Sequence, residues 1–222
     1  MNYIVLDLEW NQPLSKSRMV RRPIALGGEI IQIGAVKLDE NLEQIDEFDQ
    51  MVKPVHYTKM NKYVKELTKI TDEDLETGIS FEEAMENFKE WCGEECLFLT
   101  WGSGDVSMIR DNCIVYGLDY QWLPQWVDAQ LMFDDLLMME GRQFSLDYAV
   151  YYLKIKGNNG HNALNDAIDT AAVIRSMDEA LEWISEELDY KNGTGEYAED
   201  YEDDYEDGYD EDLEDEDEPE EK

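Results

Sequence analysis

The sequence predicts an α/β protein built on a mixed five-stranded sheet that is flanked by helices. Apolar, β-branched runs of strand length alternate with stretches in which apolar residues recur every three or four positions, as on one face of a helix. The second and third predicted strands follow one another through a short polar turn, which indicates an antiparallel meander, whereas helices separate the later strands. The 222 residues are 43% hydrophobic and 11% aromatic, which is sufficient for a sizeable core.

Five strands are expected, in chain order, at residues 3–8, 29–38, 44–52, 97–101 and 125–128. The first is a β-branched, apolar run whose polar residues come only at its end, a composition typical of a strand buried on both faces. Polar residues at 39–42 form the turn between the second and third strands.

The expected helices occupy residues 81–92, 105–116, 129–138, 145–152 and 164–188. The first begins after Ser80, a candidate N-cap with Glu83 three residues later, as in a capping box. The last is expected to lie on the sheet, because its apolar residues form one stripe at helical spacing. That stripe consists of Ala167, Ala171, Ile174, Leu181, Ile184 and Leu188.

Charge divides the chain into two regions. Lys and Arg number 18 against 54 Asp and Glu, a net charge of −36, and residues 196–222 alone hold 18 acids and one base. We expect residues 1–190 to form the folded domain and residues 191–222 to be a disordered acidic tail, because so charged a segment cannot collapse. The tail is interpreted as a solubilising extension or as a docking segment for a basic protein partner.

Charge and cysteine content also narrow the class of protein. The acidic balance argues against a nucleic-acid binder with a broad basic face, but not against an enzyme that meets phosphates through metal ions. Cys92, Cys96 and Cys113 match neither the spacing of a redox or zinc motif nor the even count of a disulfide framework, so we expect reduced, packed thiols. Since no stretch has the features of a signal peptide or membrane span, we expect a cytoplasmic protein without membrane contact.

Three segments carry acids or a histidine at positions suited to chemistry. Asp7 and Glu9 lie two residues apart at the end of the first strand, so their side chains project from one face and repel each other unless a cation lies between them. Asp105 opens a helix after the fourth strand, and His161 and Asp166 stand at the start of the last helix. Each segment alone has a simpler interpretation, such as a frayed strand end, an acid at a helix N-terminus or polar surface.

In combination and in this order, the D-x-E pair, the later Asp and the H-x4-D motif resemble the DEDD-type 3′-5′ exonucleases of the histidine subgroup. The resemblance covers residues 1 to about 188 and extends to the segments 29–36, 52–54, 66–71 and 163–171. The middle motif, Trp-Gly-Ser-Gly-Asp at 101–105, is similar to the branch that contains the histone-messenger 3′-end exonuclease and KapD. Lys69 stands where the family frequently has a glycine.

The resemblance implies a ribonuclease H-like fold and a metal-dependent exonuclease that hydrolyses 3′ ends of single-stranded RNA or DNA, with RNA favoured. It further implies that Asp7, Glu9, Asp105 and Asp166 hold two Mg²⁺ ions, for which Mn²⁺ can substitute, and that His161 is the general base. These roles suit the chemistry, because two divalent ions can stabilise both the attacking and the leaving oxygen and Mg²⁺ prefers carboxylate ligands. Histidine is the most frequent general base in enzymes.

Substrate contacts are expected from Trp10, Leu67 and Trp101. Trp10 could stack on the terminal base or, equally, pack beneath the metal site. A local basic rim is expected from residues after the first strand and around the segment 66–71, namely Lys16, Arg18, Arg21, Arg22, Lys53, Lys59, Lys62, Lys65 and Lys69. The alternative function is a non-catalytic regulatory protein that uses this scaffold to bind protein partners. The oligomeric state does not follow from the sequence.

Overall fold

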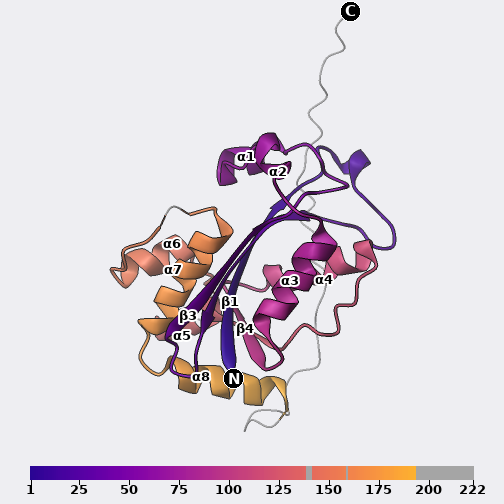
Figure 1. Ribbon diagram of the computed structural model, residues 1–222. Helices are drawn as coiled ribbons and strands as arrows, with labels where there is room; N and C mark the ends of the chain where they lie inside the picture. Colours follow the sequence, from indigo (N-terminus) through magenta and orange to yellow (C-terminus); the bar gives the residue numbers. More distant parts are fainter. Residues whose placement is uncertain (139–141, 159, 194–222) are drawn as a thin grey trace, which may run out of the picture.

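The computed structural model describes residues 1–138, 142–158 and 160–193, and the predicted acidic tail lies outside them except for its first three residues. A five-stranded sheet runs through the molecule with helices on both sides (Figure 1). Its strand order is β3-β2-β1-β4-β5, with β1 in the centre. The β1–β2 and β2–β3 pairs are antiparallel and the β1–β4 and β4–β5 pairs are parallel. The predicted mixed five-stranded sheet is therefore confirmed.

The strands are β1 (Asn2–Asn11), β2 (Glu29–Leu38), β3 (Gln44–Met51), β4 (Cys96–Thr100) and β5 (Trp126–Asp128). Their bounds agree with the prediction to within one residue, except at the end of β1. This strand continues beyond Leu8, because β2 supplies partners for its polar end, with Asp7 opposite Gly34 and Glu9 opposite Gln32. Asp7 and Glu9 thus lie inside a paired strand, just before a bulge.

The helices are α1 (Lys62–Thr68), α2 (Asp72–Leu75), α3 (Phe81–Cys92), α4 (Gly104–Tyr116), α5 (Ala129–Leu136), α6 (Leu146–Tyr152), α7 (Ala163–Arg175) and α8 (Ala180–Lys191), with a 3-10 turn η1 (Lys16–Arg18). The predicted N-cap of α3 is confirmed, since Ser80 Oγ accepts a hydrogen bond from Glu83 N at 3.2 Å. None of the described helices is long and apolar enough to span a membrane.

The single helix predicted for residues 164–188 is wrong. Two helices, α7 and α8, replace it, and the residue before α8, Glu179, adopts a left-handed backbone with φ of 67°. In Figure 1, α8 lies across the lower edge of the molecule at an angle to α7. The turn places Met177 and Ala180 in the core, whereas Leu181, predicted to be buried, is 40% exposed. A continuous helix would have kept the predicted stripe on one face.

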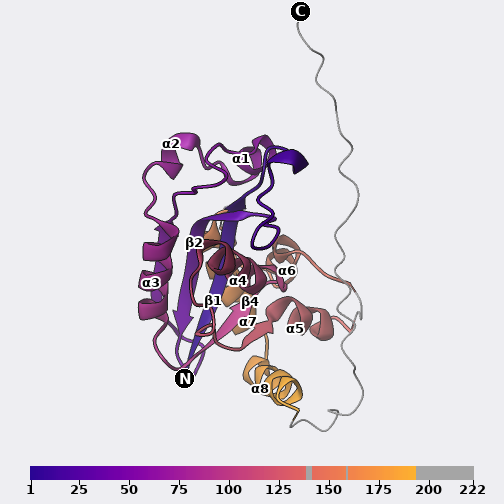
Figure 2. The same cartoon turned by 90° about the vertical axis from the view of Figure 1, so that its right-hand side faces the viewer.

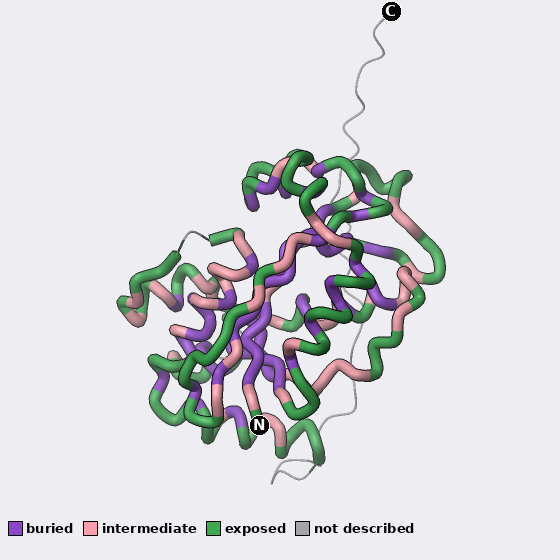
Figure 3. Tube along the Cα trace, in the orientation of Figure 1, coloured by how far each residue is buried: buried purple, intermediate pink, exposed green. Residues whose placement is uncertain are grey.

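Two hydrophobic clusters cover the two faces of the sheet, because side chains alternate along each strand. Ile4, Leu6 and Leu8 of β1 pack towards α3 and α4, whereas Tyr3 and Val5 pack in the cluster that includes α5, α7 and α8. Figure 2 shows α3 on one side of the strands and α5 and α8 on the other, and Figure 3 shows buried residues concentrated along the strands. Asp7 and Glu9 continue the Tyr3–Val5 alternation, which directs them to the α7 side.

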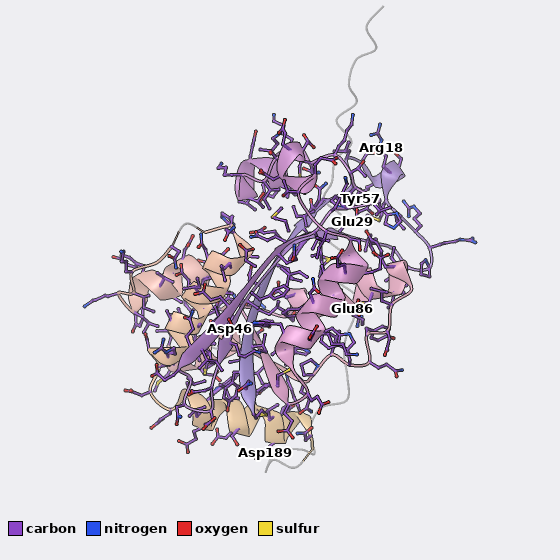
Figure 4. All side chains as sticks on the ribbon, in the orientation of Figure 1. Arg18, Glu29, Asp46, Tyr57, Glu86 and Asp189 are labelled. Carbon is purple, nitrogen blue, oxygen red and sulfur yellow. The ribbon has the colours of Figure 1, made fainter. Side chains whose placement is uncertain are left out.

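The segments around η1, α1 and α2 form a cap beyond the sheet end at which β1 terminates (Figure 1). Glu29, which is buried, fixes this cap because its carboxylate accepts hydrogen bonds from the backbone N–H groups of residues 55–57, including Tyr57. The Tyr57 hydroxyl in turn donates to Leu26 O at 2.7 Å and accepts from Val20 N at 3.1 Å. Figure 4 shows Glu29 and Tyr57 together at the base of the cap, below Arg18.

Candidate active site

Three carboxylates from two distant segments converge on the α7 side of β1. Asp7 and Glu9 come from β1 and Asp166 from the first turn of α7, and one oxygen of each lies within 4.8 Å of the other two. Glu9 is 9% exposed, whereas Asp7 and Asp166 are half-buried. This arrangement brings together the D-x-E pair of β1 and the H-x4-D motif before α7, which the sequence indicates separately as candidate sites.

Gly34 allows α7 to approach β1 closely enough for this convergence. It is the β2 partner of Asp7, and a Cβ at this position would lie 2.1 Å from the Ala163 carbonyl carbon and from the backbone nitrogen of Leu164. The backbone of α7 therefore rests directly on the strand, where any side chain would separate the two. Gln32 fixes the start of the helix, because its side-chain oxygen accepts a hydrogen bond from Ala163 N at 3.2 Å.

Asp105 joins the site from the opposite face of the sheet. It lies in the first turn of α4, and its Oδ1 accepts a hydrogen bond from Leu8 N at 3.1 Å. The strand β4 ends at Thr100, opposite Leu6, so the next N–H of β1 on this side has no strand partner and the carboxylate takes that place. Asp105 lies outside the group of three carboxylates, but its charge acts on both Asp7 and Glu9.

His161 lies on the turn that precedes α7, and its side chain is exposed. Its backbone has φ of 60°, and its N–H donates to Asp166 Oδ2 at 2.8 Å. A left-handed, non-glycine residue requires support from its surroundings. A second acid supplies it: Asp169, buried one turn further along α7, accepts hydrogen bonds from Asn158 N at 2.9 Å and from Asn158 Nδ2 at 2.7 Å.

Sequence reasoning noted Asp169 within the matched motif but gave it no role. The spacing of Asp166 and Asp169, three residues apart, is the available signal, because such residues are neighbours on one helix face. The two carboxylates hold the His161 turn at two points, one on each side of Gly160. The position of the histidine therefore depends on a residue outside the predicted set.

Burial and mutual repulsion disfavour the charged forms of these acids. They raise the pKa of Glu9 to about 8, through burial first and then the charges of Asp166 and Asp105. Burial also raises the pKa of Asp105 to about 7, although its hydrogen bond from Leu8 N acts in the opposite direction. The pKa of Asp7 is raised well above its usual value, by burial and then by the other three acids. Burial raises the pKa of Asp166, while its hydrogen bond from His161 N lowers it.

Among the described residues, no Lys or Arg forms an ion pair with any of these four acids. Several buried carboxylates without a counter-charge are unfavourable unless they are protonated or bind a cation. Carboxylate oxygens are the preferred ligands of hard divalent ions such as Mg²⁺ and Mn²⁺. The donor set and its geometry therefore fit a divalent metal site.

The three predicted substrate-contact residues have different surroundings. Trp10 is half-buried, and its ring packs on Gly28, where a Cβ would lie 2.3 Å from the ring, and beside Gly104 of α4, where a Cβ would lie 4.0 Å from it. These contacts favour the interpretation as a packing residue. Trp101 packs on Phe133 with ring centroids 5.9 Å apart. Leu67 is half-buried on α1 and belongs to none of the hydrophobic clusters of the described residues.

Comparison with known proteins agrees with this geometry. The chain matches the exonuclease family RNase_T over residues 4–174. The chain belongs to this exonuclease family. The Bacillus subtilis protein named probable 3′-5′ exonuclease KapD is 22% identical over 182 residues, which are 82% of this chain and 86% of KapD. The PolC-type DNA polymerase III of Thermotoga petrophila is 32% identical over 157 residues, which are 70% of this chain but only 11% of the polymerase.

Solved structures show the same fold. The nuclease domain of 3′hExo, described as a DEDDh family member bound to rAMP, has a TM-score of 0.66 at 20% identity and covers 83% of this chain and 92% of that domain. Exonuclease I of E. coli, in complex with a dA16 oligonucleotide, has a TM-score of 0.67 at 15% identity, and the matched region covers 86% of this chain and 44% of the Exonuclease I chain. The predicted ribonuclease H-like fold and the predicted enzyme class, a hydrolytic 3′-5′ exonuclease, are confirmed.

Proposed function

We propose that this exonuclease is metal-dependent, belongs to the histidine subgroup and removes nucleotides from the 3′ ends of single-stranded nucleic acid, with RNA as the favoured substrate. The observation that carries the proposal is the convergence of Asp7, Glu9 and Asp166, with Asp105 beside them and no ion pair to these acids from any Lys or Arg that the structure describes. We assign catalysis to residues 1–190, the last of which belong to α8.

Each residue has a role that its surroundings support. Asp7, Glu9 and Asp166 would hold divalent metal directly, and Asp105 would complete the site from the α4 side. Bound Mg²⁺ would stabilise the charge on the attacking and leaving oxygens of the phosphodiester. His161 would accept the proton of the attacking water, since its exposed side chain faces solvent while its backbone is tied to Asp166.

Basic residues support a polyanionic substrate. The cap around η1, α1 and α2 carries nine of the 18 Lys and Arg residues of this acidic chain, those predicted to form a basic rim. Lys53 pairs with Glu76 and Lys65 with Asp72, whereas Arg18 and Lys59 are exposed and form no ion pair among the described residues. Local attraction of phosphates by the cap would offset the repulsion expected from the net charge.

Two structural relatives support the proposed preference for single-stranded RNA. The 3′hExo domain was solved with rAMP, and another relative of this fold is described as recognising the 3′ end of a histone mRNA stem-loop. The oligonucleotide in the Exonuclease I complex is DNA, so a comparison of the two sugars is part of the test.

The test is incubation of the purified protein with 5′-labelled RNA and DNA of one sequence, in Mg²⁺, Mn²⁺ or EDTA. We expect a ladder that shortens from the 3′ end only when metal is present, and none from Asp7→Ala. The matched control is Glu86→Ala, an exposed acid on α3 (labelled in Figure 4), the helix that covers the other face of the sheet from α7, and it should retain the wild-type rate. Wild-type activity in Asp7→Ala would overturn the site, and the absence of any ladder would favour the non-catalytic alternative.

A further inference from the structure

Helix α6 exposes an unusual number of tyrosines. Of the six exposed tyrosines among the described residues, three lie on this helix of seven residues, with exposed fractions of 40% for Tyr148, 80% for Tyr151 and 48% for Tyr152. Figure 1 shows α6 on the outside of the molecule beside α7. Aromatic side chains at an exposed helix face are costly to leave in water, which indicates a contact surface.

Two of these tyrosines continue a row of near-parallel rings. Phe144 and Tyr148 are stacked with centroids 4.8 Å apart and planes at 19°, and Tyr148 and Tyr152 follow at 6.2 Å and 23°. The spacing of four residues aligns the rings on one side of the helix, where all three also pack edge-on against the buried ring of Phe133, with centroids between 5.9 and 6.4 Å apart. The row therefore turns only its outer edges to solvent, whereas Tyr151 is 80% exposed. From Phe144 to Tyr152 the row extends ~12 Å at 1.5 Å per residue, the length of roughly three or four nucleotides at the 3.4 Å spacing of a duplex strand.

Helix α6 begins near the proposed catalytic site. Phe144 O accepts hydrogen bonds from Trp101 Nε1 at 3.1 Å and from Gln130 Nε2 at 2.7 Å, which ties the start of α6 to the turn that leads to Asp105. A Cβ on Gly160 would lie 3.6 Å from Asp166 Oδ1 and 3.8 Å from Asp147 Oδ1, so the first turn of α6 adjoins a metal-site acid. The tyrosines therefore lead away from the reacting centre.

The segment 142–156 carries a net positive charge, opposite in sign to the charge of the whole chain. Arg142 precedes the helix and Lys154 and Lys156 follow it, while Asp147 is the only acid between residues 142 and 156. All three basic side chains are exposed, and none forms an ion pair with another described residue. Aromatic faces flanked by cations are the combination that binds single-stranded nucleic acid, through base stacking and phosphate contacts.

We propose that the exposed face of α6, formed by Tyr148, Tyr151 and Tyr152 with Arg142, Lys154 and Lys156 at its ends, binds the single strand upstream of the bond that is cut. This inference rests on the proposed exonuclease function and assigns the path of its substrate. A base of the upstream strand stacks on the exposed ring of Tyr151, neighbouring bases contact the outer edges of Tyr148 and Tyr152, and the basic side chains contact the phosphates. Short substrates that end at the catalytic site do not reach this face.

The test compares kcat and KM on substrates of two, four, eight and twelve nucleotides, in the sugar that the wild type prefers. The variant Tyr151→Leu should raise KM about fivefold or more for the two longest substrates, because a base–aromatic stack contributes strongly to affinity. For the dinucleotide, both constants should stay within about twofold of wild type. Tyr151→Phe, which keeps the ring, should retain the wild-type KM on the long substrates.

Two further variants control for the change of residue and test the cations. Tyr190→Leu, which removes a tyrosine that is 42% exposed on α8, should leave all constants unchanged. Lys154→Gln/Lys156→Gln should lower the slope of log KM against log salt by about 1.4, at about 0.7 per phosphate contact on a single strand. Lys89→Gln, an exposed lysine on α3, should not change that slope.

The outcomes separate the inference from the function on which it rests. An unchanged long-substrate KM in Tyr151→Leu, as expected if α6 instead binds a protein, would overturn the inference. An equal loss on the dinucleotide and the twelve-nucleotide substrate would also overturn it, because it would show that the tyrosines only support the fold. Failure of the proposed function would instead leave the wild type inactive on every length.

Discussion

Replacing Glu9 by Gln should stabilise the metal-free protein at alkaline pH, although the change removes a proposed metal ligand. In the folded protein, burial and the neighbouring acids raise the pKa of Glu9 from 4.5 to about 8. A raised folded-state pKa means that the folded state binds the proton more tightly, so this stability is present below pH 4.5 and is lost as the pH rises through 8. Glutamine does not titrate in this range, so the variant keeps this stability as the pH rises.

The size of the effect follows from the two pKa values. At about 1.4 kcal/mol per pH unit, ionisation of Glu9 lowers the free energy of unfolding by about 1 kcal/mol at pH 5 and by about 4 kcal/mol at pH 8. The free energy of unfolding of Glu9→Gln should therefore exceed that of wild type by about 1 kcal/mol at pH 5 and by about 4 kcal/mol at pH 8. At pH 8 the gain corresponds to a shift of roughly 2 M in the urea midpoint.

The assay is urea unfolding in EDTA at both pH values, with Glu86→Gln as the control for loss of an exposed carboxylate. Saturating Mg²⁺ should stabilise the wild type at pH 8 but should have little effect on Glu9→Gln, since only a ligand bound by the folded state stabilises it. A stability difference that is equal at pH 5 and pH 8, or a variant less stable than wild type at pH 8, would refute the reasoning.

Three further substitutions test how the site is positioned. Gly34→Ala should remove activity and lower stability by about 3 kcal/mol, because its Cβ meets the α7 backbone; Gly27→Ala, whose Cβ meets nothing within 4 Å, is the control, and equal behaviour of the two would contradict the argument. His161→Ala should lower kcat between about 10² and 10⁴-fold, while metal titration by calorimetry remains as in wild type. Asp169→Ala should release Asn158 and lower kcat about tenfold or more with metal affinity retained; an unchanged kcat would show that this anchor is dispensable.

The strands are predictable because a central strand needs an apolar run, and the sequence supplies these runs with clear polar ends. The end of β1 is the exception. Asn11 resembles the residues that follow a strand, yet it is buried in β1 because its Nδ2 donates to Tyr57 O at 2.7 Å and to Lys59 O at 2.8 Å. Hydrogen-bond partners more than 40 residues away satisfy this buried polar side chain, and no local sequence pattern predicts them.

The break between α7 and α8 is not predictable for a related reason. No Gly or Pro lies between Arg175 and Ala180, and Glu179 takes the left-handed conformation that would ordinarily favour glycine. Burial of Met177 at the turn accompanies this conformation. Lys69 shows the same behaviour in the cap, where φ of 64° at the end of α1 is a left-handed conformation that favours glycine, the residue that the family resemblance leads one to expect there.

The candidate site is predictable in its residue types but not in its supports. Motif order alone selects the acids, whereas their convergence depends on Gly34 beneath α7 and on the end of β4, which leaves Leu8 N for Asp105. Neither dependence has a local signal, because each links residues that are more than 90 positions apart in the chain. The catalytic roles remain predictions that the substitutions above address.

The most direct test of the account is the rate of 3′ shortening as a function of free Mg²⁺, measured for wild type and for Glu9→Gln at pH 8. The stability assay shows beforehand that the variant is folded, so inactivity can be assigned to the site. We predict that the wild-type rate rises from zero with Mg²⁺ and that Glu9→Gln remains inactive over the same concentrations. Shortening that persists in EDTA, or a wild-type rate from Glu9→Gln, would contradict the proposed metal site.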